Sequence, residues 1–454
     1  MIEWKEEDIQ YMAVELPDAV KFYKYAGDFK GERAEIAEYL KKDIPYGLRK
    51  RLEIEDEIAF QTDKDYRISF DGLLGKIREQ YPACAPENLE YIIGLGNADY
   101  IMRNGERFFL HSAPSNILDC NERYLKSLET GVVPEAAKNP LRHENLDIMR
   151  RKGYRRVRIR IEENLEVRGN GARPGEKIKV HLPFPAQTDN QYDITVNSAS
   201  HPYYISESGQ RTAYMESVYK EGERFTIDFS YTLDVPYFRP DPAEVSPEQP
   251  DFFTDELYPQ IRFTPAILTL ASELRGDETN NLILARRAYD WVTKHVVYSY
   301  MRDYLCIDFI PEFAMMNGRG DCGVMALLFI TLCRAMGVPA RWQSGSHVRP
   351  TGIGSHDWAQ FYVAPYGWMW ADPSFGGGAL RSGDTELWDH YAYNLDVFRE
   401  INNTEIQSAF DPPRKYLRHD PYDSQSGEAE YDDYGPDFNE LRKWRKVISY
   451  EELD

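Results

Sequence analysis

The chain has 454 residues, of which 42% are apolar and 28% are charged, a composition typical of a folded protein of about three domains and unlike that of a disordered chain. Its 75 acidic and 54 basic residues give a net charge of −21, which argues against a general nucleic-acid binder and against a protein that binds anionic membranes. The acidic start of the chain, the lack of a membrane-length apolar run and five scattered cysteines predict a cytoplasmic protein with reduced thiols.

The first 153 residues carry apolar side chains mostly at helical spacing. Residues 100–109 are an exception and resemble a hairpin with an Asn-Gly turn. We predict a mostly helical N-terminal domain over residues 1–153, in which His111 and Cys120 are structural.

From Tyr154 the apolar spacing changes from the helical period to alternation, and further strand-like runs follow between turns. Three arginines alternate with apolar residues on the first of these runs, and we expect them to lie on a solvated face. We predict an all-β sandwich domain over residues 154–234. Six prolines between residues 235 and 259 predict an extended linker.

The third predicted unit, residues 260–418, begins with two helical patterns. After it, residues 420–440 contain eight acidic residues and neither Lys nor Arg. We predict that residues 419–454 form an acidic, solvated tail, with calcium binding as the alternative interpretation.

The stretch that indicates chemistry is Gly318-Arg319-Gly320-Asp321-Cys322-Gly323, which precedes an apolar helix that Gly337 ends. Cys322 is expected in the first turn of that helix, where free amide groups and the helix dipole favour a thiolate. None of the other four cysteines has such a setting. Cys322 is therefore the candidate nucleophile.

A thiolate nucleophile needs a base, and the base needs an orienting group. His356 lies near the start of one predicted strand, and Asp372 ends the next strand of the same hairpin. Asp357 is the rival orienting carboxylate, but a residue that directly follows His356 on a strand points to the opposite face. His347 is the rival base, and it is expected in a turn flanked by Gly and Ser.

These motifs resemble the transglutaminase-like superfamily, whose members are thiol enzymes on a papain-related fold. The resemblance covers about residues 280–376 and rests on a helix that leads into an aromatic segment, on the Gly-Asp-Cys-Gly helix start, and on the pair His356-Asp357-Trp358 and Trp370-Ala371-Asp372-Pro373. It implies that Cys322 is the nucleophile, His356 the base and acid, and Asp372 the orienting group. The preceding β-domain also resembles the sandwich found in many bacterial members.

Acyl transfer also needs donors for the oxyanion, and the candidates are the Cys322 backbone amide and the side chains of Tyr298, Tyr300 and Gln343. The sequence thus predicts an α+β protein: a helical domain, a β-sandwich and a papain-like, transglutaminase-like core. We expect a hydrolase that cuts an amide bond of a peptide, protein or small amide substrate, without cofactor or metal. A true transglutaminase and a non-catalytic peptide-binding module remain the alternatives.

Overall fold

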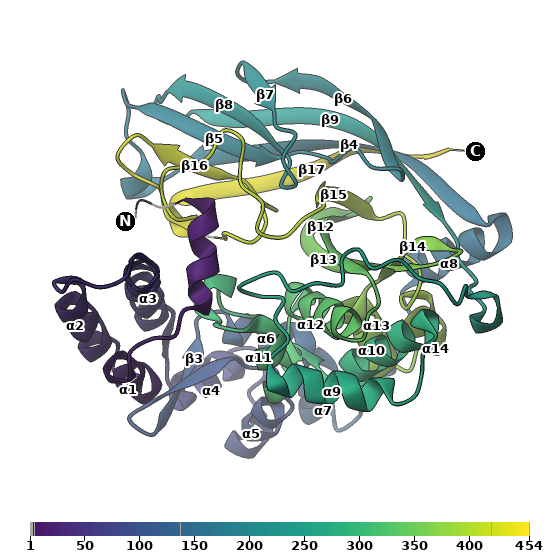
Figure 1. The fold of residues 1–454 in the computed structure, drawn as a ribbon, viewed down its shortest axis with the longest axis horizontal. Coiled ribbons are helices and arrows are strands. Elements are labelled where there is room, and N and C mark those ends of the chain that lie inside the picture. Colours follow the sequence, from purple (N-terminus) through teal and green to yellow (C-terminus); the bar gives the residue numbers. More distant parts are fainter. Residues whose placement is uncertain (1–2, 4, 137, 419, 454) are drawn as a thin grey trace.

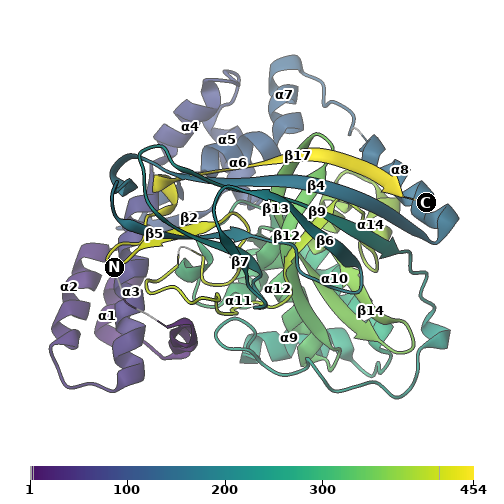
Figure 2. The ribbon, with the colours of Figure 1, turned by 90° about the horizontal axis from the view of Figure 1, so that it is seen from above.

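The computed structural model describes residues 3, 5–136, 138–418 and 420–453. The N-terminal part is mostly helical (Figures 1 and 2), with a small sheet of order β1-β3-β2. Its helices are η1 (Glu6–Ala13), α1 (Asp18–Ala26), α2 (Phe29–Leu40), α3 (Tyr46–Asp65), α4 (Phe70–Arg78), α5 (Pro86–Gly94), α6 (Ala113–Cys120), α7 (Glu122–Thr130) and α8 (Pro140–Lys152). The strands are β1 (Tyr66–Ile68), β2 (Tyr100–Arg103) and β3 (Glu106–Leu110).

Local sequence explains where several of these elements turn or stop. The predicted hairpin is confirmed: Asn104 and Gly105 join β2 to β3 with φ of +48° and +84°, as an Asn-Gly turn requires. Asn139 caps the start of α8, and Gly153 ends that helix in the left-handed conformation. The chain then enters the β part directly at Tyr154.

Two four-stranded sheets, β16-β5-β8-β7 and β17-β4-β9-β6, share one apolar core. Their strands are β4 (Tyr154–Val167), β5 (Lys177–Pro183), β6 (Gln191–Ala199), β7 (Tyr203–Ile205), β8 (Thr212–Val218), β9 (Arg224–Pro236), β16 (Glu428–Tyr431) and β17 (Leu441–Leu453). On β4, Val157, Ile159 and Ile161 are fully buried. Arg156 and Arg160 on the other face pair with Asp234 and Asp228 of β9.

The C-terminal segment is not a solvated tail, and that prediction is wrong. Strand β16 pairs with β5, and β17 pairs with β4 from Leu441↔Val167 to Leu453↔Arg156. Figure 1 shows β17 running beneath the blue strands of the β part. The acids of this stretch are compatible with folding because several of them are paired, for example Glu428 with Arg414 and Arg418.

The third part is built on the sheet β14-β13-β12-β15. Its helices are α9 (Pro265–Arg275), α10 (Asn281–His295), η4 (Tyr304–Cys306), α11 (Ile310–Asn317), α12 (Cys322–Ala335), α13 (Pro373–Arg381) and α14 (Thr385–His390). Its strands are β10 (Val297–Tyr298), β11 (Arg319–Gly320), β12 (Ala340–Arg349), β13 (Gly352–Val363), β14 (Gly367–Ala371) and β15 (Arg399–Asn403). No helix of the described residues is long and apolar enough to cross a membrane.

The two faces of this sheet meet different partners. Ala359 and Phe361 of β13 pack in one core with the apolar helix α12. Trp358 of the same strand, and Trp370 of β14, pack in the core that the two β sheets share. Because neighbouring residues of a strand point to opposite faces, the side on which a β13 residue lies determines whether it can reach α12.

Candidate active site

Cys322 begins helix α12, as the sequence predicts. Asp321 caps the helix by accepting a hydrogen bond from the Val324 amide (3.1 Å), and the Tyr304 hydroxyl donates to the same Asp321 oxygen (2.5 Å). Residues 323–334 of the helix are buried on every side. The thiol is therefore held at a fixed helix start, where a substrate could approach only from the open end.

A cavity of about 900 Å³ lies at this end of α12. Cys322, Asp357, Tyr298 and Asp321 line it from the core, and residues of the N-terminal helices and of the C-terminal segment complete its wall. His111, which we predicted to be structural, lines this cavity and is exposed, with its ring nitrogen 3.8 Å from Asp65. All three parts of the chain thus contribute to one cavity around the thiol.

The side chain that meets the thiol is Asp357. The Sγ atom of Cys322 donates to Oδ2 of Asp357 over 3.2 Å, and among the described residues no hydrogen bond joins Cys322 to His356. Asp357 shares the α12 side of β13 with Ala359 and Phe361, whereas His356 lies with Trp358 on the other side. His356 and Asp357 thus lie on opposite faces of β13, as strand alternation predicts, and the face of Asp357 is the one that reaches the cysteine.

His356 and Asp372 form the contact that the hairpin predicted. His356 Nε2 lies 2.8 Å from Asp372 Oδ2, and Arg399 donates to the same oxygen over 2.8 Å. The imidazole is buried and stacks on Phe375 at 4.1 Å between ring centres. Burial lowers the pKa of His356, and the charges of His356 and Arg399 outweigh burial and hold the pKa of Asp372 below its usual range.

The electrostatic setting of Cys322 is the reverse of the predicted one. Burial raises the pKa of the thiol well above its ordinary value, and the carboxyls of Asp357 and Asp321 raise it further. Burial and the charge of Asp321 raise the pKa of Asp357 to about 8, and burial raises that of Asp321 to about 6. Burial of the thiol, together with the two neighbouring carboxyls, therefore opposes the thiolate that the helix dipole is predicted to favour.

This setting predicts how the cysteine reacts with alkylating agents. Cys322 should react slowly with iodoacetamide at pH 7 and progressively faster up to pH 9, because only the thiolate attacks. In Asp357→Asn the reaction at pH 9 should be faster than in the unmodified chain, since Asp357, whose pKa is raised to about 8, is ionised at that pH and its charge opposes the thiolate. Mass spectrometry of the labelled peptides after brief exposure measures both rates. Fast labelling of the unmodified chain at pH 7, unchanged by Asp357→Asn, would contradict the assignment of Asp357 as the thiol's partner.

Of the candidate side-chain donors for the oxyanion, Tyr298 and Tyr300 line the Cys322 cavity and Gln343 does not. Tyr298 lines the cavity beside Cys322, whose proximity adds to the effect of burial in raising the tyrosine pKa, and its hydroxyl has no hydrogen-bond partner among the described residues. The Tyr300 hydroxyl donates to Asp119 of α6 (2.7 Å). Gln343 accepts hydrogen bonds from two tryptophans, Trp358 and Trp370, on the face away from α12. Tyr298 is therefore the side-chain donor that the geometry supports, and Gln343 is not one.

The rival base His347 lies within strand β12, not in a turn as predicted. Its ring is 5.0 Å from that of Phe375 and 6.2 Å from that of His356. Burial lowers the pKa of His347 to about 2. It belongs to the buried cluster around His356 and does not line the Cys322 cavity.

The sequence reasoning missed the cavity residues of the C-terminal segment, among them Asp423, Gln425 and Lys443. The side-chain amide of Gln425 donates to Asp357 Oδ1. The sequence holds one indication of this: Trp444, Val447, Ile448 and Tyr450 follow the acidic stretch and favour a strand. No three His, Cys, Asp or Glu side chains of the described chain are arranged to hold a metal ion.

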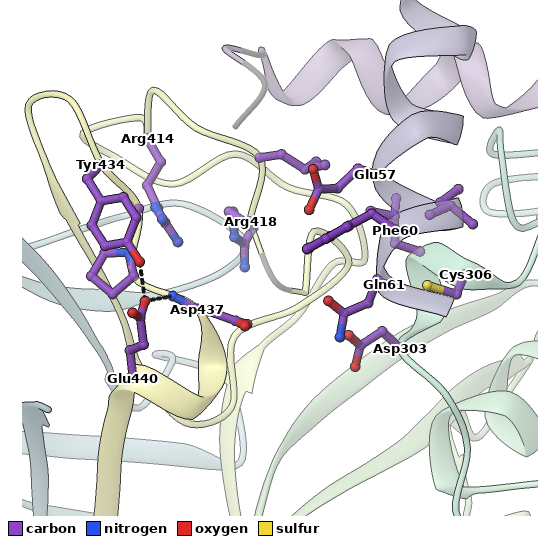
Figure 3. A pocket seen from close by; sticks show the side chains of 15 residues that line it. Glu57, Phe60, Gln61, Asp303, Cys306, Arg414, Arg418, Tyr434, Asp437 and Glu440 are labelled. Atoms are coloured by element: carbon purple, nitrogen blue, oxygen red, sulfur yellow. Dashed lines mark hydrogen bonds between the residues drawn. The ribbon is translucent and has the colours of Figure 1, made fainter. Parts of the chain in front are cut away.

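A second cavity, of about 360 Å³, adjoins the first and shares four lining residues with it: Gln61, Asp303, Arg414 and Pro436. Figure 3 shows Glu57, Phe60 and Gln61 reaching into it from α3, opposite Tyr434 and Glu440 of the C-terminal segment. The Tyr434 hydroxyl donates to Glu440. Cys306 lies in its wall, and burial raises the pKa of that thiol.

One segment of the chain matches a known protein family. The model of the transglutaminase-like superfamily matches residues 268–373. The uncharacterized protein YebA of Bacillus subtilis strain 168 is 23% identical over 129 residues, which are 24% of this chain and 17% of that relative. The chain therefore spans about a sixth of this curated relative.

Two kinds of solved structure are similar to this chain at low identity. A "putative cysteine protease" of Cytophaga hutchinsonii is 15% identical with a TM-score of 0.42, covering 66% of this chain and 91% of that one. The periplasmic domain of TgpA from Pseudomonas aeruginosa is 14% identical with a TM-score of 0.28, covering 53% of this chain and 94% of that one. Residues 268–373, which hold Cys322, His356 and Asp372, form a domain of the transglutaminase-like superfamily.

Proposed function

We propose that this protein is a cysteine-nucleophile hydrolase that cuts an amide bond in a peptide, a protein or a small amide. The observation that supports it is the hydrogen bond from the Cys322 thiol to Asp357, at the start of α12 and in the wall of a cavity of about 900 Å³. A thiol with an adjacent proton acceptor is the minimal arrangement for nucleophilic catalysis.

In the proposed reaction, ionised Asp357 takes the thiol proton while the sulfur bonds to the substrate carbonyl carbon. The oxyanion receives hydrogen bonds from the Cys322 amide and the Tyr298 hydroxyl. Asp357 then gives its proton to the departing amine as the carbon–nitrogen bond breaks. Water attacks the thioester, the acid leaves, and the thiol regains its proton.

The pair of His356 and Asp372 supplies a second candidate for the base. It is the pair to which the sequence resemblance assigns the role, and the two side chains are in contact. In this arrangement His356 would need to turn to the α12 side of β13. If Asp357 is the base, Asp357→Asn should lose activity and His356→Gln should keep most of it. If His356 is the base, the losses should be the reverse.

Turnover of a panel of peptides and amides, with and without an added primary amine, tests the function. The unmodified chain should release acid and little amine adduct, and Cys322→Ala should abolish turnover because the attacking atom is gone. Cys333→Ala is the matched control: this residue lies eleven positions later in the same helix, is buried, and should leave turnover intact.

A different product would change the assignment. If amine adduct exceeds acid at modest amine concentration, the protein is a transglutaminase. If a peptide binds equally to the unmodified chain and to Cys322→Ala, and neither turns it over, the protein is a non-catalytic binding module.

A further inference from the structure

A third cavity, of about 690 Å³, lies at the C-terminal end of α12, the opposite end of this helix from the candidate nucleophile. It is lined by Arg334 in the last turn of α12 and by Arg341 and Trp342 at the start of β12. Helix η1 and the segments 253–258 and 404–409 contribute the rest of the lining. None of these described residues also lines the cavity of the candidate active site, so the two cavities are separate.

Arg334 is exceptional among the buried arginines of the described residues. Seven arginines are buried there, and six of them form an ion pair with a carboxylate: Arg51, Arg155, Arg319, Arg399, Arg414 and Arg418. Arg334 instead donates to the carbonyl oxygens of Ala340 and Asp255 (both 2.8 Å), and no described residue accepts from its Nη2 atom. Burial lowers its pKa to about 10, and the charge of Asp255 offsets only part of this effect. Because buried charges in proteins are normally paired, this guanidinium in a cavity wall indicates a site for an anion.

Two more groups that line the cavity have donors without an acceptor in the described chain. Arg341 donates to Gln360 through Nε (2.8 Å), but neither of its Nη atoms donates to a described residue. Its guanidinium carbon lies 4.0 Å from the centre of the Trp368 ring. The Trp342 side chain is almost fully buried, and its indole N–H has no acceptor among the described residues. Since a buried N–H without a partner is unfavourable, a ligand oxygen in the cavity would satisfy it.

Apolar side chains lie next to these donors. The ring centre of Phe253 is 5.7 Å from the guanidinium carbon of Arg334 and 6.0 Å from that of Arg341, so both cations lie near the same aromatic ring. Further apolar and aromatic residues line the cavity: Ile9, Leu257, Tyr258, Ile406 and Ala409. The cavity therefore combines a few convergent polar donors with apolar surface, which is the usual composition of a ligand site.

The charges in the cavity determine which anion suits it. Glu7 and Glu405 also line it, but both are exposed to solvent, and in the described chain neither forms an ion pair with Arg334 or Arg341. Burial lowers the pKa of Arg341, and the charges of Asp189 and Glu405 offset only part of this effect. The two carboxylates repel a doubly charged phosphate more strongly than a singly charged ligand. A planar carboxylate also matches the fork of a guanidinium.

We propose that this cavity binds a small organic carboxylate with an apolar body. The carboxylate accepts hydrogen bonds from Arg334, Arg341 and the indole N–H of Trp342, and the apolar body lies against Phe253. The volume of about 690 Å³ is within the usual range for ligand sites, about 300–1,000 Å³. The site goes beyond the proposed function and does not depend on it.

Isothermal titration of the full chain with 4-phenylbutyrate tests the site. The acid should bind with a Kd below about 1 mM, and 4-phenylbutanol, which has the same body without the charge, should bind at least about tenfold more weakly. In Arg341→Gln the affinity for the acid should fall by about 10–100-fold, because charge-assisted hydrogen bonds are lost. Arg349→Met is the matched control: this residue lies on the same strand, is exposed and is outside the cavity, so the variant should bind the acid normally.

The indole of Trp342 provides a second readout, which locates the ligand. In the ¹H–¹⁵N spectrum of the protein labelled at tryptophan, the indole signal that is absent from Trp342→Phe is that of Trp342. The acid should shift this signal downfield, because the indole proton enters a hydrogen bond to a charged oxygen, and the alcohol should leave it in place. If Arg341→Gln fails to fold, Trp342→Phe replaces it in the titration, with an expected loss of about tenfold in affinity.

The outcomes decide between a carboxylate site and its alternatives. Equal binding of the acid and the alcohol, equal binding of the acid by the unmodified chain and by both cavity variants, or no binding of the acid would each overturn the proposal. If phenyl phosphate binds and 4-phenylbutyrate does not, the ligand is a phosphate and the carboxylate assignment is wrong. None of these results bears on turnover at Cys322, which the comparison with Cys322→Ala tests separately.

Discussion

Asparagine in place of Asp357 should lower kcat/KM by about 10²–10⁴-fold near neutral pH, the usual loss when a general base is removed. Asn keeps the size and one oxygen of the side chain but cannot take the thiol proton. In the unmodified chain, kcat/KM should rise with pH through about 8, because Asp357 must be ionised to act and its pKa is raised to that value. Asp357→Asn should abolish this rising limb.

His356→Gln is the matched comparison, because His356 directly precedes Asp357 on the same strand. It should reduce activity much less, since the imidazole faces the buried pair with Asp372 and not the thiol. Urea unfolding of both variants must accompany the kinetics, because His356 is buried. Loss of activity in folded His356→Gln, with Asp357→Asn still active, would assign the base to His356 and require a rotated β13.

Arg399→Met should destabilise the protein by about 3–5 kcal/mol, the usual cost of removing one partner of a buried ion pair. Arg399 bridges Asp372 (2.8 Å) and Asp396 (3.1 Å), and all three side chains are almost completely buried. Methionine would leave both carboxylates without their cation. Unfolding in guanidinium chloride at pH 7 measures the loss.

The stability lost in Arg399→Met should depend on pH, in a direction that the pKa values of the two carboxyls determine. His356 and Arg399 together keep the pKa of Asp372 below its usual range despite burial, and Arg399 does the same for Asp396. Their stabilising contribution is therefore present above the unfolded-state pKa of about 3.9 and is lost as the pH falls. The difference between the unmodified chain and Arg399→Met should narrow below pH 4. Lys177→Met removes an exposed pair with Glu216 of the neighbouring strand and should cost far less at any pH. An equal loss of stability in the two variants would contradict the role given to burial of the Arg399 pairs.

The sequence was informative wherever a local pattern determines the structure. Apolar periodicity and the Gly-Asp-Cys-Gly stretch place Cys322 at the start of α12, and alternation predicts the buried side of β4. The His356–Asp372 contact followed from the hairpin between β13 and β14, which two strands joined by a short turn almost impose. Each of these features depends on residues close together in the chain.

What could not be predicted depends on contacts between distant segments. Which face of β13 meets α12 is set by the packing of the β sheets on the other side, so the choice between His356 and Asp357 is invisible in the local pattern. The acidic composition of residues 420–440 suggested solvation, because the ion pairs of Glu428 with Arg414 and Arg418 arise only in the fold. Gln425 reaches Asp357 across 68 positions of sequence.

The position of β17 beside β4 has a consequence for folding during synthesis of the chain. Strand β4 is flanked by β9 on one side and β17 on the other, yet β17 is translated more than 270 residues later. Until it leaves the ribosome, one edge of β4 has no neighbour and can pair with other chains. The wall that Gln425, Leu441 and Lys443 give to the Cys322 cavity is also missing at that stage. A nascent chain would therefore expose both an unpaired, aggregation-prone edge of β4 and an incomplete Cys322 cavity. Folding of β17 would cover that edge and complete the cavity wall.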